Sequence, residues 1–335
     1  MFNVAVVGAT GAVGSTMLRV LEERGFPVSE LRPLASERSE GREIDYLGQP
    51  RTVRTLTADA FEGIHIALFS AGGDRAREFA PAAVEAGAVV IDNSSAFRMD
   101  PAVPLVVPEV NEADIQGHHG IIANPNCVAA PLVVALKPIA DAVGLERVIV
   151  SSYQSVSGTG QAAVAELLAQ SAGYLAGDEP EPSVYPHPIA FNVLPHIDTF
   201  DESGYTGEER KVAAETRKML GLPDLAVSAT CVRVPVIQSH SQAVHIETTE
   251  AIGADAVRRL LMAAPGVVLV DEPELGLYPL PRVATGRDEV LVGRIRKDSS
   301  HSRGLALWVV SDNLRKGAAT NAVQIAESLV TRGWL

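Results

Sequence analysis

Cys127 is the residue of this chain whose type and setting most directly suggest chemistry. It follows Asn124-Pro125-Asn126 and precedes an apolar run of helical composition, so a helix is expected to begin near it. A free cysteine is usually a small buried hydrophobic residue. A helix N-terminus, however, favours negative charge and lowers the pKa of a thiol, so the same position also suits a thiolate nucleophile. The other groups that reach the sulfur decide between these two interpretations.

A histidine beside that sulfur could serve as its acid or base, and the family resemblance described below implies this role for His240. As an imidazolium it would also help to lower the pKa of the thiol. His240 stands seven positions after Arg233, and an odd separation places two side chains on opposite faces of a straight strand. The two side chains converge only if the chain turns between Val236 and Ser239, which we predict. Otherwise His240 is an ordinary polar loop residue.

Three glycines, Gly8, Gly11 and Gly14, stand between a short apolar run at Val4–Val7 and a segment of helical spacing at 15–25. Strand, glycine turn and helix in this order are typical of dinucleotide-binding domains, in which amides at the helix N-terminus face a pyrophosphate. The first step of the spacing is one residue wider than the usual fingerprint. A tight turn without a ligand is the alternative, and we expect a nucleotide site.

The end of the next strand indicates which dinucleotide is bound. An Asp or Glu in that position usually accepts from the ribose hydroxyls of NAD, whereas the 2′-phosphate of NADP needs donors and positive charge. Ser36, Arg38 and Ser39 supply such donors, although Glu37 and Glu40 lie close by in the sequence. A solvated polar turn is the alternative. We predict NADP as the cofactor.

The order of apolar segments predicts the fold class. Continuous apolar strands recur at 65–73 and 88–95 with a helical segment between them, which indicates a parallel sheet covered on both faces. After about residue 127, longer strand-like segments at 147–158 and 226–236 indicate a second, mixed sheet. A chain of 335 residues, 47% hydrophobic, commonly forms two domains. We therefore predict an α/β protein with a Rossmann-type parallel-sheet domain and a second mixed-sheet α+β domain.

The composition argues against several classes of partner. A formal net charge of -13 and a pI near 5.1 leave no basic surplus for nucleic acid or an anionic membrane. No apolar run approaches the roughly 18 residues of a spanning helix and no basic leader opens the chain, so we expect a cytoplasmic protein without a membrane partner. The two cysteines and eight histidines have no metal-ligand spacing, so no metal is expected. Cys231, within a strand-like run, is interpreted as core packing.

The segment "GYTGEERK" contains a predicted helix start and two charged groups. Thr206 and Glu209 have capping-box spacing, which predicts a helix with Thr206 as its N-cap. Glu208 and Lys211, three residues apart, then share one helical face. They form either a surface ion pair or a clamp for a charged ligand. Arg98 presents a similar choice between a solvated face and an anion site.

Several segments, ordered along nearly the whole chain, resemble the aspartate-semialdehyde dehydrogenase family. They are "VAVVGATGAVG", "LASERSEG", "IDNSSAFRMD", "VPLVVPEVN", "ANPNC", "SSYQSVSGTG", "IAFNVLPHID", "GYTGEERK", "SATCVRVPV" and "KGAATNAVQIAE". The resemblance implies an NADP-binding Rossmann domain at 1–127 plus 315–335, and a catalytic and dimerisation domain at 128–314 in a homodimer.

The resemblance also implies the reaction. This is the reversible, NADP-dependent reductive dephosphorylation of L-aspartyl 4-phosphate to L-aspartate 4-semialdehyde and phosphate through a cysteine thioester. In the family it serves lysine, methionine, threonine and diaminopimelate biosynthesis. The small-molecule substrate and phosphate are therefore the expected partners.

Roles for individual residues follow from the same resemblance. The catalytic set is Cys127 as nucleophile, His240 as acid/base and Gln154 as the residue that orients the acyl intermediate. The substrate-binding set is Arg98 and Lys211 for phosphate, Arg233 and Glu208 for the carboxylate and amine, and Asn126. The cofactor-binding set is Gly8, Thr10, Gly11, Ala12, Val13, Gly14, Ser36, Arg38, Ser39, Ser70, Ser157, Gly158, Asn321 and Gln324.

Two positions depart from the family pattern. Val128-Ala129-Ala130 stand where hydroxyl residues are usual, and Pro131 follows. Either the helix begins near Cys127 with Pro131 in its first turn, or regular helix begins later. Ser239 stands where glycine is usual, so a Cβ atom restricts the loop that carries His240.

Rival functions share parts of this pattern. N-acetyl-glutamyl-phosphate reductase has a similar fold and cysteine, and glyceraldehyde-3-phosphate dehydrogenase uses the same thioester logic. The segments "GEERK" and "VRVPVIQSH" favour the aspartyl substrate. A catalytically silent NADP-binding homologue is the rival from another class. The joint presence of Cys127, Gln154, Arg233 and His240 argues against it.

Overall fold

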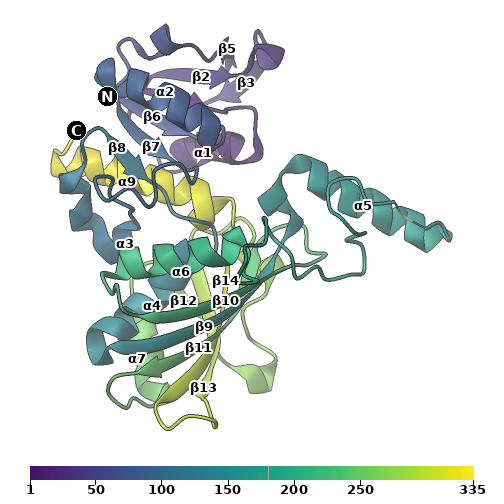
Figure 1. Cartoon of the computed structure of the whole chain (residues 1–335). Coiled ribbons are helices and arrows are strands. Elements are labelled where there is room, and N and C mark those ends of the chain that lie inside the picture. Colours follow the sequence, from purple (N-terminus) through teal and green to yellow (C-terminus); the bar gives the residue numbers. More distant parts are fainter. Residues whose placement is uncertain (180) are drawn as a thin grey trace. The chain divides into compact units, whose positions relative to one another are not determined.

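The chain consists of two compact units, each built on its own six-stranded sheet (Figure 1). The computed structural model describes residues 1–179 and 181–335. The first unit comprises Met1–Asn126 and Ala318–Leu335, and the second comprises Cys127–Gly317. The C-terminal segment therefore completes the unit that the N-terminal segment begins.

The sheet of the first unit is parallel throughout, with the strand order β5-β2-β1-β6-β7-β8. Its strands are β1 (Phe2–Val7), β2 (Val28–Ala35), β5 (Arg54–Thr55), β6 (Ile66–Phe69), β7 (Val89–Asp92) and β8 (Ile121–Ala123). Its α-helices are α1 (Ala12–Glu23), α2 (Gly73–Glu85), α3 (Pro108–Asn111) and α9 (Thr320–Arg332). Smaller elements are the hairpin β3 (Glu43–Tyr46) and β4 (Gln49–Thr52), and the 3-10 helices η1 (Glu37–Ser39), η2 (Ala58–Phe61) and η3 (Glu112–Gly117). The predicted Rossmann-type sheet is confirmed.

Helices cover both faces of this sheet, which explains why its strands are apolar without alternation. Val4 and Val6 of β1 belong to a core cluster that contains residues of α1 and α9. Ala5 and Val7 point to the other face and belong to a cluster that contains alanines of α2. The C-terminal helix α9 is thus part of the core of the first unit.

The glycine turn between β1 and α1 depends on close backbone contact. A Cβ atom on Gly14 would lie 2.1 Å from the carbonyl oxygen of Gly8, so the helix packs directly on the end of the strand. Gly8 has φ +83°, a conformation that glycine adopts without strain. The predicted order of strand, turn and helix is confirmed.

The second unit has a mixed sheet with the strand order β10-β9-β11-β14-β13-β12. Its strands are β9 (Leu145–Gln154), β10 (Ala226–Arg233), β11 (His240–Thr248), β12 (Val267–Leu269), β13 (Val290–Lys297) and β14 (Gly304–Ser311). Its α-helices are α4 (Ala129–Val143), α5 (Gln161–Ala176), α6 (Gly207–Leu220), α7 (Ala254–Ala263) and α8 (Pro281–Ala284). It also contains the 3-10 helices η4 (Val156–Thr159) and η5 (Pro273–Leu275), and the π-helix η6 (Arg315–Ala319) spans the boundary of the two units in the sequence. The predicted mixed sheet is confirmed.

One face of the second sheet is covered by helices and the other is open in the single chain. On β9, Val148 and Val150 are buried, whereas Ile149 and Tyr153 on the opposite face are more than one-third exposed. Helix α5 extends away from the sheet of its unit (Figure 1). Among the described residues, no helix combines the length and the apolar composition needed to span a membrane.

Replacing Gly14 by alanine tests the close packing of α1 on β1. Because the new Cβ atom would meet the Gly8 backbone, we expect the free energy of unfolding of Gly14→Ala to fall by roughly 1–3 kcal/mol. Urea unfolding followed by circular dichroism measures this change. Gly117→Ala is the matched control, since its Cβ atom meets nothing within 4 Å, and it should change stability by less than about 0.5 kcal/mol. Equal stability of the two variants would contradict this account.

Candidate active site and nucleotide-binding cavity

Cys127 immediately precedes the first turn of α4. The helix begins at Ala129 with Val128 as its N-cap, and Pro131 is the third helical residue. The first four N–H groups of a helix have no acceptor within it, so proline at this position removes no helical hydrogen bond. The first of the two expected arrangements, with Pro131 in the first turn, is therefore confirmed. Gln242 of β11 donates from Nε2 to the Val128 carbonyl oxygen at 3.0 Å, which ties this turn to the sheet.

His240, the first residue of β11, places its ring beside this sulfur. Nε2 of His240 lies 3.3 Å from Sγ of Cys127. On the other side of the ring, Nδ1 accepts a hydrogen bond from the main-chain N–H of Ser155 at 3.0 Å. A main-chain N–H can only donate, so Nδ1 carries no proton and the proton of the neutral ring is on Nε2.

The expected imidazolium is not favoured in this setting. Burial of His240, together with the nearby Arg233 guanidinium, lowers the pKa of the ring well below its usual value of 6.5. The imidazole therefore stays neutral near pH 7. It can act on the sulfur as a hydrogen-bond donor, but it supplies no full positive charge, which corrects the expectation from the sequence.

The predicted turn before His240 is confirmed. β10 pairs with β9 in parallel and β11 pairs with β9 on its other side in antiparallel, so the chain crosses the end of β9 between Arg233 and His240. A Cβ atom on Gly158 would lie 3.0 Å from Nη1 of Arg233 and 3.3 Å from Nε2 of His240. The two side chains thus converge on Gly158. Ser239 has φ +75°, the left-handed conformation that explains why glycine is usual there.

Gln154, at the end of β9, is linked to the charged pair on α6. Its Nε2 donates to Oε1 of Glu208 at 3.3 Å and to Oγ of Ser152 at 3.1 Å. Oε2 of Glu208 lies 3.9 Å from Nζ of Lys211, which donates to Oδ2 of Asp198 at 2.6 Å. That hydrogen bond is the main cause of the lowered pKa of Asp198. The structure therefore joins Gln154, Glu208 and Lys211 in one polar chain.

Two further predictions on these elements are confirmed. Thr206 caps α6 in a capping box with Glu209, as its spacing indicates. Arg233 is buried and donates from Nη1 to the Ser155 carbonyl oxygen at 2.7 Å. Its buried Nε has no hydrogen-bond partner among the described residues, so this guanidinium retains a donor for an added anion.

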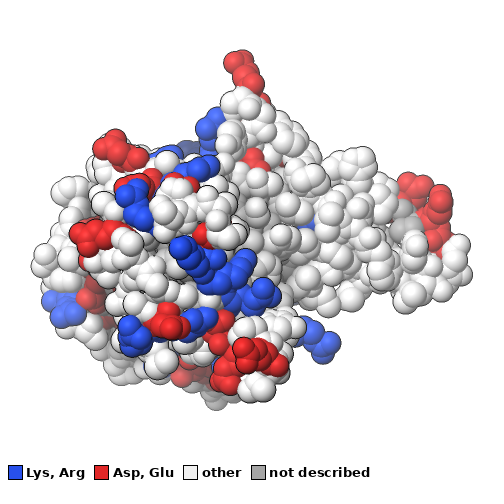
Figure 2. All heavy atoms as spheres, turned by 90° about the horizontal axis from the view of Figure 1, so that it is seen from below, with Lys and Arg blue, Asp and Glu red and all other residues white. Residues whose placement is uncertain are grey.

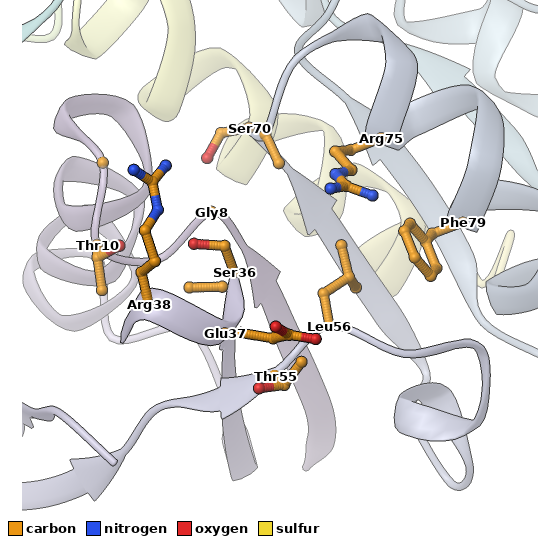
Figure 3. Close-up of a pocket in the computed structure, with 13 residues that line it drawn as sticks. Gly8, Thr10, Ser36, Glu37, Arg38, Thr55, Leu56, Ser70, Arg75 and Phe79 are labelled. Carbon is orange, nitrogen blue, oxygen red and sulfur yellow. The ribbon is translucent and has the colours of Figure 1, made fainter. Parts of the chain in front are cut away.

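The first unit contains a cavity of about 750 Å³ at the glycine turn. Its lining includes six residues of the predicted cofactor-binding set, namely Gly8, Thr10, Gly11, Ser36, Arg38 and Ser70. Figure 3 shows Arg38 and Arg75 reaching the cavity from opposite sides, with Glu37 beside Thr55. The cavity combines main chain at a helix N-terminus with two guanidinium groups, which is the chemistry that a phosphorylated nucleotide needs.

Sequence reasoning missed Arg75 and Phe79, which line the same cavity from α2. The available signal was their position on the helix after β6, because adjacent parallel strands bring their carboxyl ends to one edge of the sheet. It also missed Ser155, whose N–H and hydroxyl oxygen both lie 3.0 Å from Nδ1 of His240, and Asn313, whose Oδ1 accepts from the Ser239 N–H.

The other predicted cofactor-binding residues do not line this cavity. In the first unit, Ala12 and Val13 form the first turn of α1 with Gly14, and Ser39 lies 3.4 Å from Thr10 between their hydroxyl oxygens. Asn321 donates to the Val106 carbonyl oxygen and to Asn124, and Gln324 donates to Glu109. Ser157 and Gly158 belong to η4 of the second unit.

Arg98 and Asn126 both belong to the first unit and are buried. Arg98 donates from Nε to the Asn124 carbonyl oxygen at 2.9 Å and from Nη2 to the Asn93 carbonyl oxygen at 2.8 Å. These bonds hold its side chain against the end of the sheet. Among the described residues, no group of three or more His, Cys, Asp or Glu side chains is arranged to hold a metal ion.

The two cysteines are expected to differ in reactivity. Burial raises the pKa of Cys231 to about 12, so at pH 8 only roughly one molecule in ten thousand carries the thiolate there. Cys127 is half-buried. With limiting iodoacetamide at pH 8, we expect peptide mass spectrometry to find modification at Cys127 and none at Cys231 until the protein is unfolded. Modification of Cys231 in the folded protein would contradict its buried, protonated state.

Known families match both units. The family described as "Semialdehyde dehydrogenase, NAD binding domain" matches residues 3–118, and "Semialdehyde dehydrogenase, dimerisation domain" matches residues 136–316. The aspartate-semialdehyde dehydrogenase of Aquifex aeolicus is 55% identical over 99% of each chain, and that of Bacillus subtilis is 53% identical over 98% of this chain and 97% of its own.

Solved structures agree with these matches. Aspartate semialdehyde dehydrogenase II of Vibrio cholerae, complexed with ASA, is 53% identical with a TM-score of 0.95, covering 99% of this chain and 98% of its own. The Candida albicans enzyme with NADP is 26% identical with a TM-score of 0.79, covering 100% of both chains. With its parallel-sheet nucleotide-binding unit, its mixed-sheet unit and these full-length similarities, this chain belongs to the aspartate-semialdehyde dehydrogenase family.

Proposed function

We propose that this chain is an NADP-dependent aspartate-semialdehyde dehydrogenase that works through a thioester at Cys127. The observation that carries the proposal is the 3.3 Å approach of His240 Nε2 to Cys127 Sγ, at an edge of the sheet that also holds Gln154 and Arg233. The names of the relatives support the substrate. Residues Met1–Asn126 with Ala318–Leu335 serve as the coenzyme domain, and Cys127–Gly317 as the catalytic and dimerisation domain.

In the biosynthetic direction the Cys127 thiolate attacks the acyl phosphate, and phosphate leaves. The resulting thioester is a far better hydride acceptor than a carboxylate, which is the reason for covalent catalysis. NADPH, when bound, supplies the hydride. His240 serves as the acid/base that protonates the reacting oxygen, and Gln154 orients the acyl group.

Substrate recognition follows from the charges of the site. The buried Arg233, with its unused Nε donor, pairs with the substrate carboxylate. Glu208, held by Gln154, accepts from the substrate amine. Lys211 leaves Asp198 to bind phosphate, which the family resemblance also assigns to Arg98, and Asn126 belongs to the substrate-binding set. Each assignment gives a buried or partly buried charge a partner of opposite sign.

The cavity of the first unit holds the cofactor. Gly8, Thr10 and Gly11 face the pyrophosphate, and Arg38 with Ser36 binds the 2′-phosphate. Arg75 adds a second guanidinium, and the Phe79 ring provides an apolar surface for the base. The remaining predicted contacts, including Ser70, Ser157, Gly158, Asn321 and Gln324, lie along the rest of the dinucleotide.

The second unit forms a homodimer. The arm made by α5 and residues 184–200 exposes several apolar side chains, among them Leu175 at 79% and Phe191 at 62%. Figure 2 shows the arm largely without charged side chains except near its end. Tyr153 on the open face of the sheet, and Tyr278 and Leu280 in the segment before α8, add further exposed apolar surface. Apolar surface of this extent on a monomer usually marks an interface, and the match to a dimerisation domain supports a second copy as its partner.

The proposed activity is tested with purified protein, aspartate semialdehyde, phosphate and NADP⁺, with growth of NADPH absorbance as the readout. Removing the nucleophile in Cys127→Ala should lower the rate by at least about 10⁴-fold. Cys231→Ala is the matched control and should retain activity, because Cys231 lies in the core. NADPH binding without any turnover would indicate the silent homologue. Faster turnover of N-acetyl-glutamate semialdehyde in a parallel assay would identify that compound, instead of aspartate semialdehyde, as the substrate.

The preference for NADP is tested at Arg38. Removing a charged hydrogen-bond donor to the 2′-phosphate should raise KM for NADP⁺ about 10- to 100-fold in Arg38→Ala and leave KM for NAD⁺ nearly unchanged. Arg42→Ala is the control, since Arg42 is exposed and does not line the cavity. An equal loss for both dinucleotides would refute the proposed contact.

A further inference from the structure

One part of the cavity in the first unit combines apolar surface with two polar side chains. Leu56, just after β5, and Phe79 of α2 line the cavity and pack against the apolar core on that side of the sheet. The main-chain N–H of Leu56 donates to the Ala35 carbonyl oxygen at 2.8 Å, which holds this segment beside the end of β2. Thr55 and Glu37 complete this part of the lining (Figure 3).

The base of a bound dinucleotide belongs in this part of the cavity. The glycine turn suits the pyrophosphate, and a ribose separates the pyrophosphate from the base. The Phe79 ring and Leu56 offer the apolar surface on which an aromatic base stacks. Cζ of Arg75 lies 5.9 Å from the centroid of the Phe79 ring, so a planar guanidinium adjoins that surface. The edge of the base then meets the polar side chains.

The Thr55 hydroxyl group is an acceptor toward the cavity. Its single hydrogen is donated from Oγ1 to Oε2 of Glu40 at 2.8 Å, and Glu40 lies outside the cavity lining. A hydroxyl group has one hydrogen and two lone pairs. Oγ1 of Thr55 therefore keeps the capacity to accept a hydrogen bond and has no second hydrogen to give to a ligand.

Glu37 adds a carboxylate at the same place. Its side chain lies beside Thr55 and Leu56, whereas the Arg38 guanidinium extends toward Thr10 (Figure 3). Within residues 1–179 and 181–335, the Glu37 carboxylate forms no hydrogen bond or ion pair. An ionised carboxylate only accepts hydrogen bonds. Two acceptors, one of them charged, therefore face the edge of the base and need donors from the ligand.

Adenine supplies the matching donors. Its 6-amino group carries two N–H donors on one nitrogen atom, whereas guanine and hypoxanthine carry an oxygen at the same position, which only accepts. Two acceptors around an amino group satisfy both of its hydrogens. The same two acceptors around an oxygen would leave lone pairs facing one another.

We propose that Glu37 is a specificity-determining residue of the nucleotide site, and that Glu37 and Thr55 together accept the two hydrogen bonds of the adenine 6-amino group. The inference rests on the proposed NADP site and names the residues that select its base. A hydrogen bond to a charged acceptor is stronger than one between neutral groups, so Glu37 contributes most of the selection.

The adenosine ribose is the competing ligand group for Glu37. A carboxylate near the end of the second strand commonly accepts from the ribose hydroxyls of NAD. In this chain the Ser36 hydroxyl group and the Arg38 guanidinium lie toward the glycine turn, which leaves Glu37 on the side of Leu56 (Figure 3). The two roles are separable by experiment, because NAD and NADP both carry adenine and only NAD has a free 2′-hydroxyl group there.

Base selection is measured by isothermal titration calorimetry with NADP⁺ and with nicotinamide hypoxanthine dinucleotide phosphate, in which an oxygen replaces the 6-amino group. The ring N–H of hypoxanthine can meet at most one of the two acceptors, and the oxygen faces the other. We expect the wild type to bind NADP⁺ about 10- to 100-fold more tightly. Equal affinity would overturn the inference and leave the NADP site standing. Failure of both compounds to bind would overturn the inference and the proposed NADP site together.

Glu37→Gln tests the residue itself. Because the amide can donate to an oxygen, the preference for NADP⁺ over the hypoxanthine compound should fall to about threefold or less, and the affinities for NAD⁺ and NADP⁺ should change by similar factors. Glu43→Gln removes the same charge at an exposed position outside the cavity lining, so it is the matched control and should keep the wild-type preference. An unchanged preference in Glu37→Gln would refute the role. A loss of affinity confined to NAD⁺ would also refute it, in favour of the ribose contact.

Discussion

The pairing of β9 with β10 on one side and β11 on the other is the constraint on which the candidate active site depends. In this register Gln154 lies opposite Arg233, and Tyr153 lies opposite Ser241, the residue after His240. Three side chains with different chemistry therefore reach one edge of the sheet from three strands. A strand slipped by one residue would turn each of them to the opposite face, so the sheet register also fixes the chemistry of the site.

Burial sets the charge states and the hydrogen-bonding needs of the groups in the site. His240 and Arg233 are buried together, which keeps the imidazole neutral and leaves the guanidinium with a donor for an anion. In such surroundings a hydrogen bond is stronger than in water, and an unpaired polar group is more costly. Ser155 satisfies this condition for His240, since its main-chain N–H and its hydroxyl group both meet Nδ1. The hydrogen bonds from Ser155 thus hold the imidazole in contact with the Cys127 thiol.

The first unit depends instead on close packing between two parts of its own backbone, the start of α1 and the end of β1. Gly14 lets α1 rest on the end of β1, and the open space that follows is lined by main chain, hydroxyl groups and two arginines. The strands behind the cavity are apolar on both faces because α1 and α9 cover one side and α2 the other. The cavity is therefore supported by a core that contains little polar surface.

The sequence by itself determined the features that depend on neighbours in the chain. These are the strand, turn and helix at Gly8–Gly14 and the capping box at Thr206 and Glu209, whereas the sequence left two possible starts for α4 and the structure selected the one with Pro131 in the first turn. Local backbone geometry and helix capping depend on a few neighbouring residues, so a short segment of sequence is enough to predict them. The turn between Arg233 and His240 followed from strand periodicity only together with the family resemblance, which places both side chains in one site.

Only the tertiary structure decided the protonation of His240 and the full lining of the cavity. The N–H that meets Nδ1 belongs to Ser155, 85 residues away in the sequence, and Asn313 is a further 158 residues from Ser155. Arg75 and Phe79 reach the cavity because β1 and β6 are adjacent in the sheet. An imidazolium was a reasonable expectation from residue types, but desolvation and a nearby cation arise only when distant segments pack together, and they reverse that expectation.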